Sequence, residues 1–179
     1  MNIFSGLFNL HDRTFSALER AAGDWLLPTL ARFAFAAVLL MYFWGSAATK
    51  LDGFGLSIGA YAQIFPQKAE AVLYDPAQFS LIEMLIIWAG TLAEFALPAL
   101  IVLGLFTRFA ALGMIGFIIV QSLTDIFGHH ADAATIGSWF DAVENARILD
   151  LRTFWVVTLI VLIVKGAGPL SVDRLIGRL

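Results

Sequence analysis

The sequence predicts an all-α protein, a polytopic membrane four-helix bundle, and two observations predict it. Of the 179 residues, 60% are hydrophobic and only 14% are charged, whereas soluble domains carry about 25% charged residues. The shortage of charge extends over most of the chain, in which four long apolar stretches follow one another. A bilayer core about 30 Å thick needs about 20 apolar residues per helix. The chain is therefore expected to cross a membrane several times.

Four predicted spans build a transmembrane domain over residues 26–168. Pro28 suits the opening turn of the first span, because its fixed backbone angle fits a helix start. Pro98 lies inside the second span, where it removes a backbone hydrogen bond and is expected to kink the helix. A short link at 106–108 makes the second and third spans antiparallel neighbours. The spans comprise residues 26–49, 81–106, 109–127 and 151–168.

Shorter amphipathic segments flank this domain. In the N-terminal segment, residues 1–25, apolar side chains recur at helical spacing, and charged residues occupy the other side. The apolar residues are Phe15, Leu18, Ala22 and Trp25. This pattern predicts a helix lying in the membrane interface, and a cytosolic lead-in helix fits it equally well. At the other end, Gly168 and Pro169 stop the fourth span. A short interfacial helix is expected in the cytoplasmic tail, residues 169–179.

Two long connections, residues 50–80 and 128–150, fall on one side of the membrane. Their aromatic residues predict that they lie on the membrane surface or cap the bundle. Basic residues favour the opposite side, which holds the N-terminus, and place both termini in the cytoplasm. The basic residues on the terminal side are Arg13, Arg20, Arg108, Lys165, Arg174 and Arg178, against Lys50, Lys68, Arg147 and Arg152 on the other.

Composition also excludes several function classes. The chain has no cysteine, which removes disulfide exchange, thiolate catalysis and c-type haem attachment. Its formal net charge of -3 lacks the positive excess that is typical of nucleic-acid-binding proteins. No phosphate-binding glycine loop, zinc-protease motif or nucleophile elbow occurs. We therefore expect no intrinsic cofactor and no complete oxidoreductase in this chain.

The most informative residues are charges inside apolar runs. Arg32 and Glu94 each lie within a predicted span, where a charge costs about 2.5–3.5 kcal/mol unless it faces protein or water. Helical phase places Lys50 on the face of Arg32, and Glu83 on the face of Glu94. Antiparallel packing of the two helices then predicts two ion pairs, Arg32–Glu94 and Lys50–Glu83.

These charges fit two interpretations. In the structural one, the pairs fix the helix register and perform no chemistry. In the functional one, they form a buried polar site for a proton, a quinone head group or a small solute. Aromatic residues at Phe43, Trp44 and Trp88 are then expected to form the pocket wall.

A second polar stripe follows the third span. Gln121 and Asp125 lie one turn apart, and His129 continues the stripe, with His130 and Asp132 after it. Clusters of aspartate and histidine can bind divalent metals. A solvated loop that caps the helix end explains the same residues, so we expect no metal here and keep Asp125, His129, His130 and Asp132 as weak candidates.

Three sequence blocks carry a family resemblance. They are Arg32 followed by Gly45 and Lys50-Leu51; Glu94 followed by Gly104-Leu-Phe-Thr-Arg108-Phe-Ala-Ala; and Gly166-Ala-Gly-Pro-Leu-Ser-Val-Asp173. In order and spacing, residues 29–175 resemble the DoxX family of small four-helix membrane proteins. The resemblance implies an integral protein of the bacterial inner membrane, associated with redox systems that include a thiosulfate:quinone oxidoreductase.

Two main functions follow as hypotheses. The first is an accessory redox module that binds a quinone inside the bundle while partner proteins carry the electron carriers. The second is a transporter or channel for a small solute or proton, with Arg32, Glu94, Gln121 and Asp125 along its path. Because four helices are few for one path, the second would need a homo-oligomer. A metal site facing the periplasm is a third, weaker hypothesis. The bilayer is the expected partner in all three, and nucleic acid in none.

Overall fold

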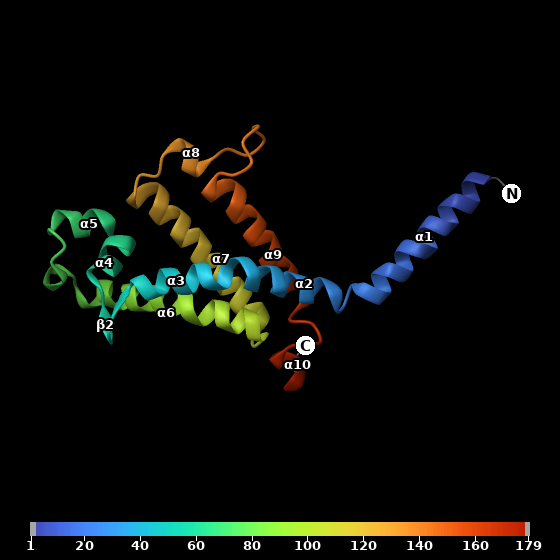
Figure 1. The fold of residues 1–179 in the computed structure, drawn as a ribbon, viewed down its shortest axis with the longest axis horizontal. Coiled ribbons are helices and arrows are strands. Elements are labelled where there is room, and N and C mark those ends of the chain that lie inside the picture. The colour runs from blue at the N-terminus through green and yellow to red at the C-terminus, as the bar shows by residue number, and fades with distance from the viewer. Residues whose placement is uncertain (1–2, 178–179) are drawn as a thin grey trace.

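The computed structural model of the chain describes residues 3–177. Residues 1–2 of the predicted N-terminal segment and residues 178–179 of the predicted tail, Arg178 included, lie outside the described residues. The longer helices are α1 (Ile3–Ala22), α2 (Leu26–Phe35), α3 (Met41–Thr49), α6 (Leu81–Leu103), α7 (Thr107–Leu123) and α9 (Arg152–Lys165) (Figure 1). The shorter elements are a π turn η1 (Ala36–Leu40), strands β1 (Leu51–Asp52) and β2 (Gly55–Leu56), helices α4 (Ile58–Ile64), α5 (Pro66–Ala71), α8 (Ala133–Ile136) and α10 (Val172–Leu175), a 3-10 turn η2 (Pro76–Gln78), and π turns η3 (Thr124–Gly128) and η4 (Arg147–Leu151).

Within the described residues, three helices are long and apolar enough to cross a membrane. They are Leu26–Thr49, which runs through α2, η1 and α3, then Leu81–Leu103, and Thr107–Gly128, which runs through α7 and η3. The all-α, multi-pass prediction is thereby confirmed. A bundle of four membrane-crossing helices is not established, because the fourth long segment, η4 with α9, is shorter and carries Arg147, Asp150, Arg152 and Lys165.

The predicted boundaries need correction at glycines. The second span ends at Leu103, before the predicted 106, because Gly104 adopts a left-handed φ of +68° that terminates the helix. The third span therefore begins two residues earlier than expected, at Thr107. The fourth helical segment begins at Arg147 and ends at Lys165, not 151–168, since Gly166 also has a positive φ.

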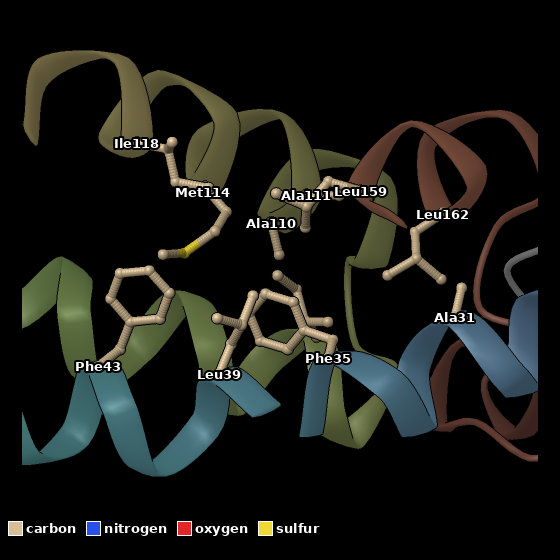
Figure 2. Close-up of a cluster of buried hydrophobic side chains, with 11 residues drawn as sticks. Ala31, Phe35, Leu39, Phe43, Ala110, Ala111, Met114, Ile118, Leu159 and Leu162 are labelled. Atoms are coloured by element: carbon tan, nitrogen blue, oxygen red, sulfur yellow. The ribbon is translucent and has the colours of Figure 1, made fainter. Parts of the chain in front are cut away.

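The core lies where α2, η1 and α3 face α6, α7 and α9. Figure 2 shows Phe35, Leu39 and Phe43 of the first span pointing toward Ala110, Ala111 and Met114 of α7. In a bilayer, lipid tails are as apolar as the helix surfaces, so the hydrophobic effect does not drive these helices together. Van der Waals contact between closely packed side chains does. The buried cluster comprises Ala31, Phe35, Leu39, Phe43, Ile101, Ala110, Ala111, Met114, Ile118, Leu159 and Leu162.

The connection at residues 50–80 packs onto the first half of α6. Tyr61 of α4 and Ala69 of α5 bury against Phe79 and Ile87. The helices and the short β1–β2 hairpin within this connection were not predicted. Residues 128–150 hold the short helix α8 at the same end of the bundle (Figure 1). Both connections therefore cover the end opposite the termini.

Helix α1 stands apart from the bundle. It extends away from α2 (Figure 1), and every side chain from Gly6 to Ala21 is exposed. The helix begins at Ile3, earlier than the predicted amphipathic pattern, and ends at Ala22, so Trp25 belongs to the turn before α2. An exposed amphipathic helix is consistent with the interfacial prediction, which stays a prediction.

Candidate functional site: a polar pocket between α3, α6 and α7

Lys50, not Arg32, is the partner of Glu94. Lys50 Nζ lies 2.8 Å from Glu94 Oε2, and the two side chains are only 5% and 3% exposed. Ser46 accepts from Lys50 Nζ at 2.9 Å and donates to Glu94 Oε1 at 3.2 Å. The predicted Arg32–Glu94 pair is therefore wrong. The register differs because the first two turns of α6 extend past the end of α3, where they pack on α4 and α5.

Glu83 lies in that extension and has a different partner. Lys68 Nζ of α5 is 2.6 Å from Glu83 Oε2, and the pair is partly exposed. Glu83 also closes a capping box with Ser80 at the start of α6. The predicted Lys50–Glu83 pair is wrong for the same reason of register. Glu83 fixes how α5 joins α6 and lies outside the polar pocket.

Arg32 binds backbone carbonyls at the other end of the bundle. Its Nε donates to Ile101 O at 3.1 Å and its guanidinium donates to Ala167 O at 3.0 Å. It also donates to Val102 O and Leu170 O. The last carbonyls of a helix lack intrahelical partners, and a cation at a helix C-terminus is favourable. Arg32 therefore fastens the end of α6 to the segment after α9.

Asp173 completes this junction. Its carboxylate accepts from Phe106 N at 2.8 Å and from Thr107 N and Oγ1 at 2.9 Å each, which caps the start of α7. Sequence reasoning missed this role. The available signal was that Phe106, the residue before α7, has no side-chain acceptor to cap the helix, so the cap had to come from elsewhere. In the structure Phe106 occupies the cap position with φ +48°. Arg32, the Gly104–Arg108 turn and Asp173, all from the blocks of the family resemblance, therefore meet at one junction.

The polar pocket lies between α3, α6 and α7, with α4 over one end. It encloses about 460 Å³, within the usual range for small-molecule sites. Its polar lining residues are Ser46, Lys50, Gln63, Glu94, Gln121, Thr124, Asp125 and His129. Gly113, Gly116 and Val120 of α7 also line it and are exposed. The pocket therefore opens sideways between α6 and α7, on the apolar surface of the spans.

Gln121 carries an unpaired buried atom inside this pocket. Its Nε2 donates to Tyr42 Oη at 3.2 Å, whereas its buried Oε1 has no hydrogen-bond partner among residues 3–177. An unpaired buried acceptor costs about 1–3 kcal/mol. The amide oxygen therefore has an acceptor capacity that no described residue uses.

Asp125 is held from the fourth helical segment. Arg152 donates to Asp125 Oδ2 at 2.5 Å and to Ser122 Oγ at 2.7 Å, and Arg152 is buried. Sequence reasoning placed Arg152 at the start of the fourth span and counted it only as a basic residue of the outer side, so its pairing with Asp125 was missed. The opposite charges at the end of the third span and the start of the fourth were the signal, since antiparallel neighbours bring these two ends together.

The predicted aromatic wall is absent from the pocket lining. Phe43 packs in the core with its ring centroid 6.0 Å from that of Phe117, and Phe117 is the aromatic that lines the pocket. Trp44 Nε1 donates to Phe95 O at 3.1 Å. The carbonyl that loses its helical donor because Pro98 has no N–H is that of Glu94, the residue before Phe95. Trp88 is half-buried on α6 and does not line the pocket.

The weak metal candidates make separate contacts. Asp125 pairs with Arg152, His129 Nε2 lies 3.1 Å from Gln63 O, and His130 lies 3.3 Å from Gln67 Nε2. Asp132 accepts from Thr135 N at 2.6 Å, and this backbone hydrogen bond lowers the pKa of the Asp132 carboxyl. Nowhere in residues 3–177 do three His, Cys, Asp or Glu side chains gather in an arrangement suited to a metal.

Comparison with known proteins gives two matches. The family model described as DoxX matches residues 27–130, more than half of the chain. An uncharacterized protein of Haemophilus influenzae is 36% identical over 104 residues, which cover 58% of this chain and 62% of that protein's length. No solved structure gives a significant match. The family match includes every residue named above as lining the polar pocket and ends before α9.

Proposed function

We propose that this chain, which belongs to the DoxX family and is a multi-pass membrane protein, is an accessory module of a membrane redox system that binds a quinone head group. The proposal places the ring in the pocket between α3, α6 and α7. One observation carries it: a sideways-opening pocket in the apolar spans contains a buried ion pair and an unpaired amide oxygen. Polar groups at such depth generally mark a functional site.

The pocket residues suit both redox states of the ring. A quinone presents two carbonyl acceptors, and a quinol presents two hydroxyl donors. The Gln121 amide can donate its second N–H to a carbonyl, and its free Oε1 can accept from a hydroxyl. Bound there, a quinone supplies two-electron chemistry that requires protons. Glu94, the buried carboxylate of the pocket, is proposed to exchange one of these protons together with its partner Lys50.

This assignment changes the role proposed for Arg32. All of its described hydrogen bonds go to backbone carbonyls, and it does not line the pocket. Lys50 cannot replace it as a free donor, since its ammonium already bonds Glu94 and Ser46. Recognition of the ring therefore falls to Gln121, with apolar contact from Phe117 and Val120.

The accessory role and the topology belong to the same proposal. Without cysteine, the chain cannot supply thiolate ligands for an iron–sulfur cluster, so a partner protein is proposed to take the electrons. In the bilayer, η4 and α9 form a fourth, shorter span, which a tilt or local thinning accommodates. The protein then lies in the bacterial inner membrane with both termini in the cytoplasm.

Solvent extraction of the purified protein tests the proposal. We expect quinone in the extract of the wild type and little in that of Gln121→Leu, with Glu94→Gln also reduced. Glu83→Gln is the matched control, because it is the same substitution on α6 outside the pocket, and it should retain quinone. A redox protein is expected to co-purify with the wild type.

A transporter is the second candidate, supported by the polar lining that extends from Glu94 to Gln63 and His129 at the covered end of the bundle. That function predicts proton or solute flux in reconstituted liposomes. Absence of both quinone and redox partner, together with flux that disappears in Glu94→Gln, would overturn the redox proposal.

A further inference from the structure

A second cavity lies at the end of the bundle that holds the termini. It encloses about 590 Å³ between the α1–α2 turn, the α6–α7 turn and the segment that follows α9. Asp24 and Trp25 line it from the first turn, and Arg108 from the start of α7. Lys165 and Arg174 line it from the C-terminal part of the chain. The cavity is therefore separate from the polar pocket at the middle of the spans.

Three cations border this cavity, and two of them have no ionic partner in the part of the chain that the structure describes. The side chains of Arg108 and Arg174 have no hydrogen bond or ion pair with any of residues 3–177. Arg108 lies across Gly166, where an added Cβ would be 3.5 Å from its Nε. Lys165 Nζ is 3.6 Å from Asp24, which is 95% exposed. The two arginines thus remain available to an anion.

Within residues 3–177, neither acid of the cavity forms an ion pair with Arg108 or Arg174. Asp173 binds the start of α7 through three hydrogen bonds, and its charge is offset there by the helix N-terminus. Asp24 lies 3.6 Å from Lys165. The free charge that borders the cavity is therefore positive.

The cavity lies at the level of the membrane interface. Trp25 immediately precedes the first span, and Arg108 is the second residue of the third. Trp25 and Phe109 are exposed large aromatic or apolar side chains beside the cations, as is typical of interfacial positions. Helix α1, with exposed Phe8 and Leu18, joins the bundle at the same place (Figure 1).

We infer that this cavity binds the phosphate of an anionic phospholipid from the leaflet on the side of the termini. A guanidinium can hold phosphate oxygens through two parallel hydrogen bonds, and Arg108 and Arg174 approach the cavity from two different elements. The acyl chains then run along the exposed ring of Phe109, outside the bundle. Free phosphate shares the anion chemistry and lacks the apolar part.

Binding to delipidated protein in a nonionic detergent tests this site. The probes are short-chain phosphatidylglycerol, short-chain phosphatidylcholine and inorganic phosphate, each titrated while the melting temperature is recorded. We expect phosphatidylglycerol to raise it, and the Arg108→Gln/Arg174→Gln variant to weaken that binding about tenfold, since each interfacial cation contributes measurably to anionic lipid binding. Arg147→Gln, an exposed arginine at the opposite end, is the matched control and should bind like the wild type.

Two further measurements keep the test decisive. The double variant should melt like the wild type without lipid, because neither side chain bonds to the described protein, and Arg108→Lys/Arg174→Lys should recover most of the binding. Equal stabilisation by inorganic phosphate or by phosphatidylcholine would overturn the anionic-lipid site. Unchanged phosphatidylglycerol binding in the double glutamine variant would overturn it as well.

Discussion

Arg32 and Glu94 are both charges inside membrane-crossing helices, yet they lie in different kinds of environment. Glu94 is in the middle of α6, paired with Lys50 at 2.8 Å beside an open pocket. Arg32 lies near the start of the first span and binds carbonyls at the ends of two other segments. Glu94 therefore lies next to a pocket that a ligand can enter, whereas the donors of Arg32 are already bonded to backbone carbonyls.

The difference lies in where each charge falls along its neighbours. A residue level with a helix terminus meets carbonyl groups that lack partners, so an arginine there becomes part of the fold. A residue level with helix middles meets only satisfied backbone, so it needs a side-chain partner. Depth relative to neighbouring helix ends therefore distinguishes the environments of these two charges, and we propose a function only for the one beside the pocket.

The largest effect is expected from removing Arg32. Arg32→Met removes hydrogen bonds to four carbonyls, of which Ile101 O keeps the Gly104 N–H, and we expect a loss of roughly 3–5 kcal/mol in the free energy of unfolding. Arg32→Lys keeps the charge with fewer donors and should recover part of the loss. Thermal unfolding in detergent measures both, and quinone content corrected for folded protein should stay unchanged in Arg32→Lys. A loss of quinone without a loss of stability would contradict the structural role.

A double-mutant cycle tests the revised pairing with a somewhat smaller effect. Glu94→Gln leaves the buried Lys50 without its counter-ion and should cost about 3 kcal/mol. Adding Lys50→Gln should return part of that, as a coupling of about 1–3 kcal/mol. In contrast, Arg32→Lys and Glu94→Gln should be additive to within about 0.5 kcal/mol. Strong coupling of Arg32 with Glu94 would instead restore the pairing expected from helical phase.

Much of the fold was predictable from the sequence. Apolar run lengths predicted the first span, 26–49, without error. Lys50, Glu94, Gln121 and Asp125 were among the predicted polar-site residues and line the pocket, whereas Arg32 and Glu83, predicted with them, do not. Helical phase was correct in placing Lys50 on the inner face of its helix. These features depend on local pattern, which a sequence contains directly.

The partners of those residues were less predictable. Pairing depends on the axial offset between helices, and the offset of α6 is set by α4 and α5, which lie in a connection without a recognised helical pattern. A shift of three turns exchanges Glu83 for Glu94 as the partner of Lys50. The Arg152–Asp125 pair was missed because Arg152 was considered only as a basic residue of the outer side, although the third and fourth spans bring the two residues together.

Substitutions at two glycines are expected to change stability least. They also test the central claim, that the pocket is a ligand site, most directly. Gly116 lines the pocket opening, and a Cβ added there meets no atom within 4 Å. Gly45 of α3 is equally unobstructed but lies outside the pocket. Replacing a helical glycine by leucine favours the helix by about 0.8 kcal/mol, so Gly116→Leu and Gly45→Leu should both fold at least as well as the wild type.

Quinone bound per folded protein should therefore be measured in these two variants and the wild type, after identical purification. The account predicts that Gly45→Leu retains the wild-type quinone content, and that Gly116→Leu loses most of it with an unchanged or raised melting temperature. Equal quinone content in all three proteins, or quinone in none of them, would contradict the assignment of this pocket as the quinone site.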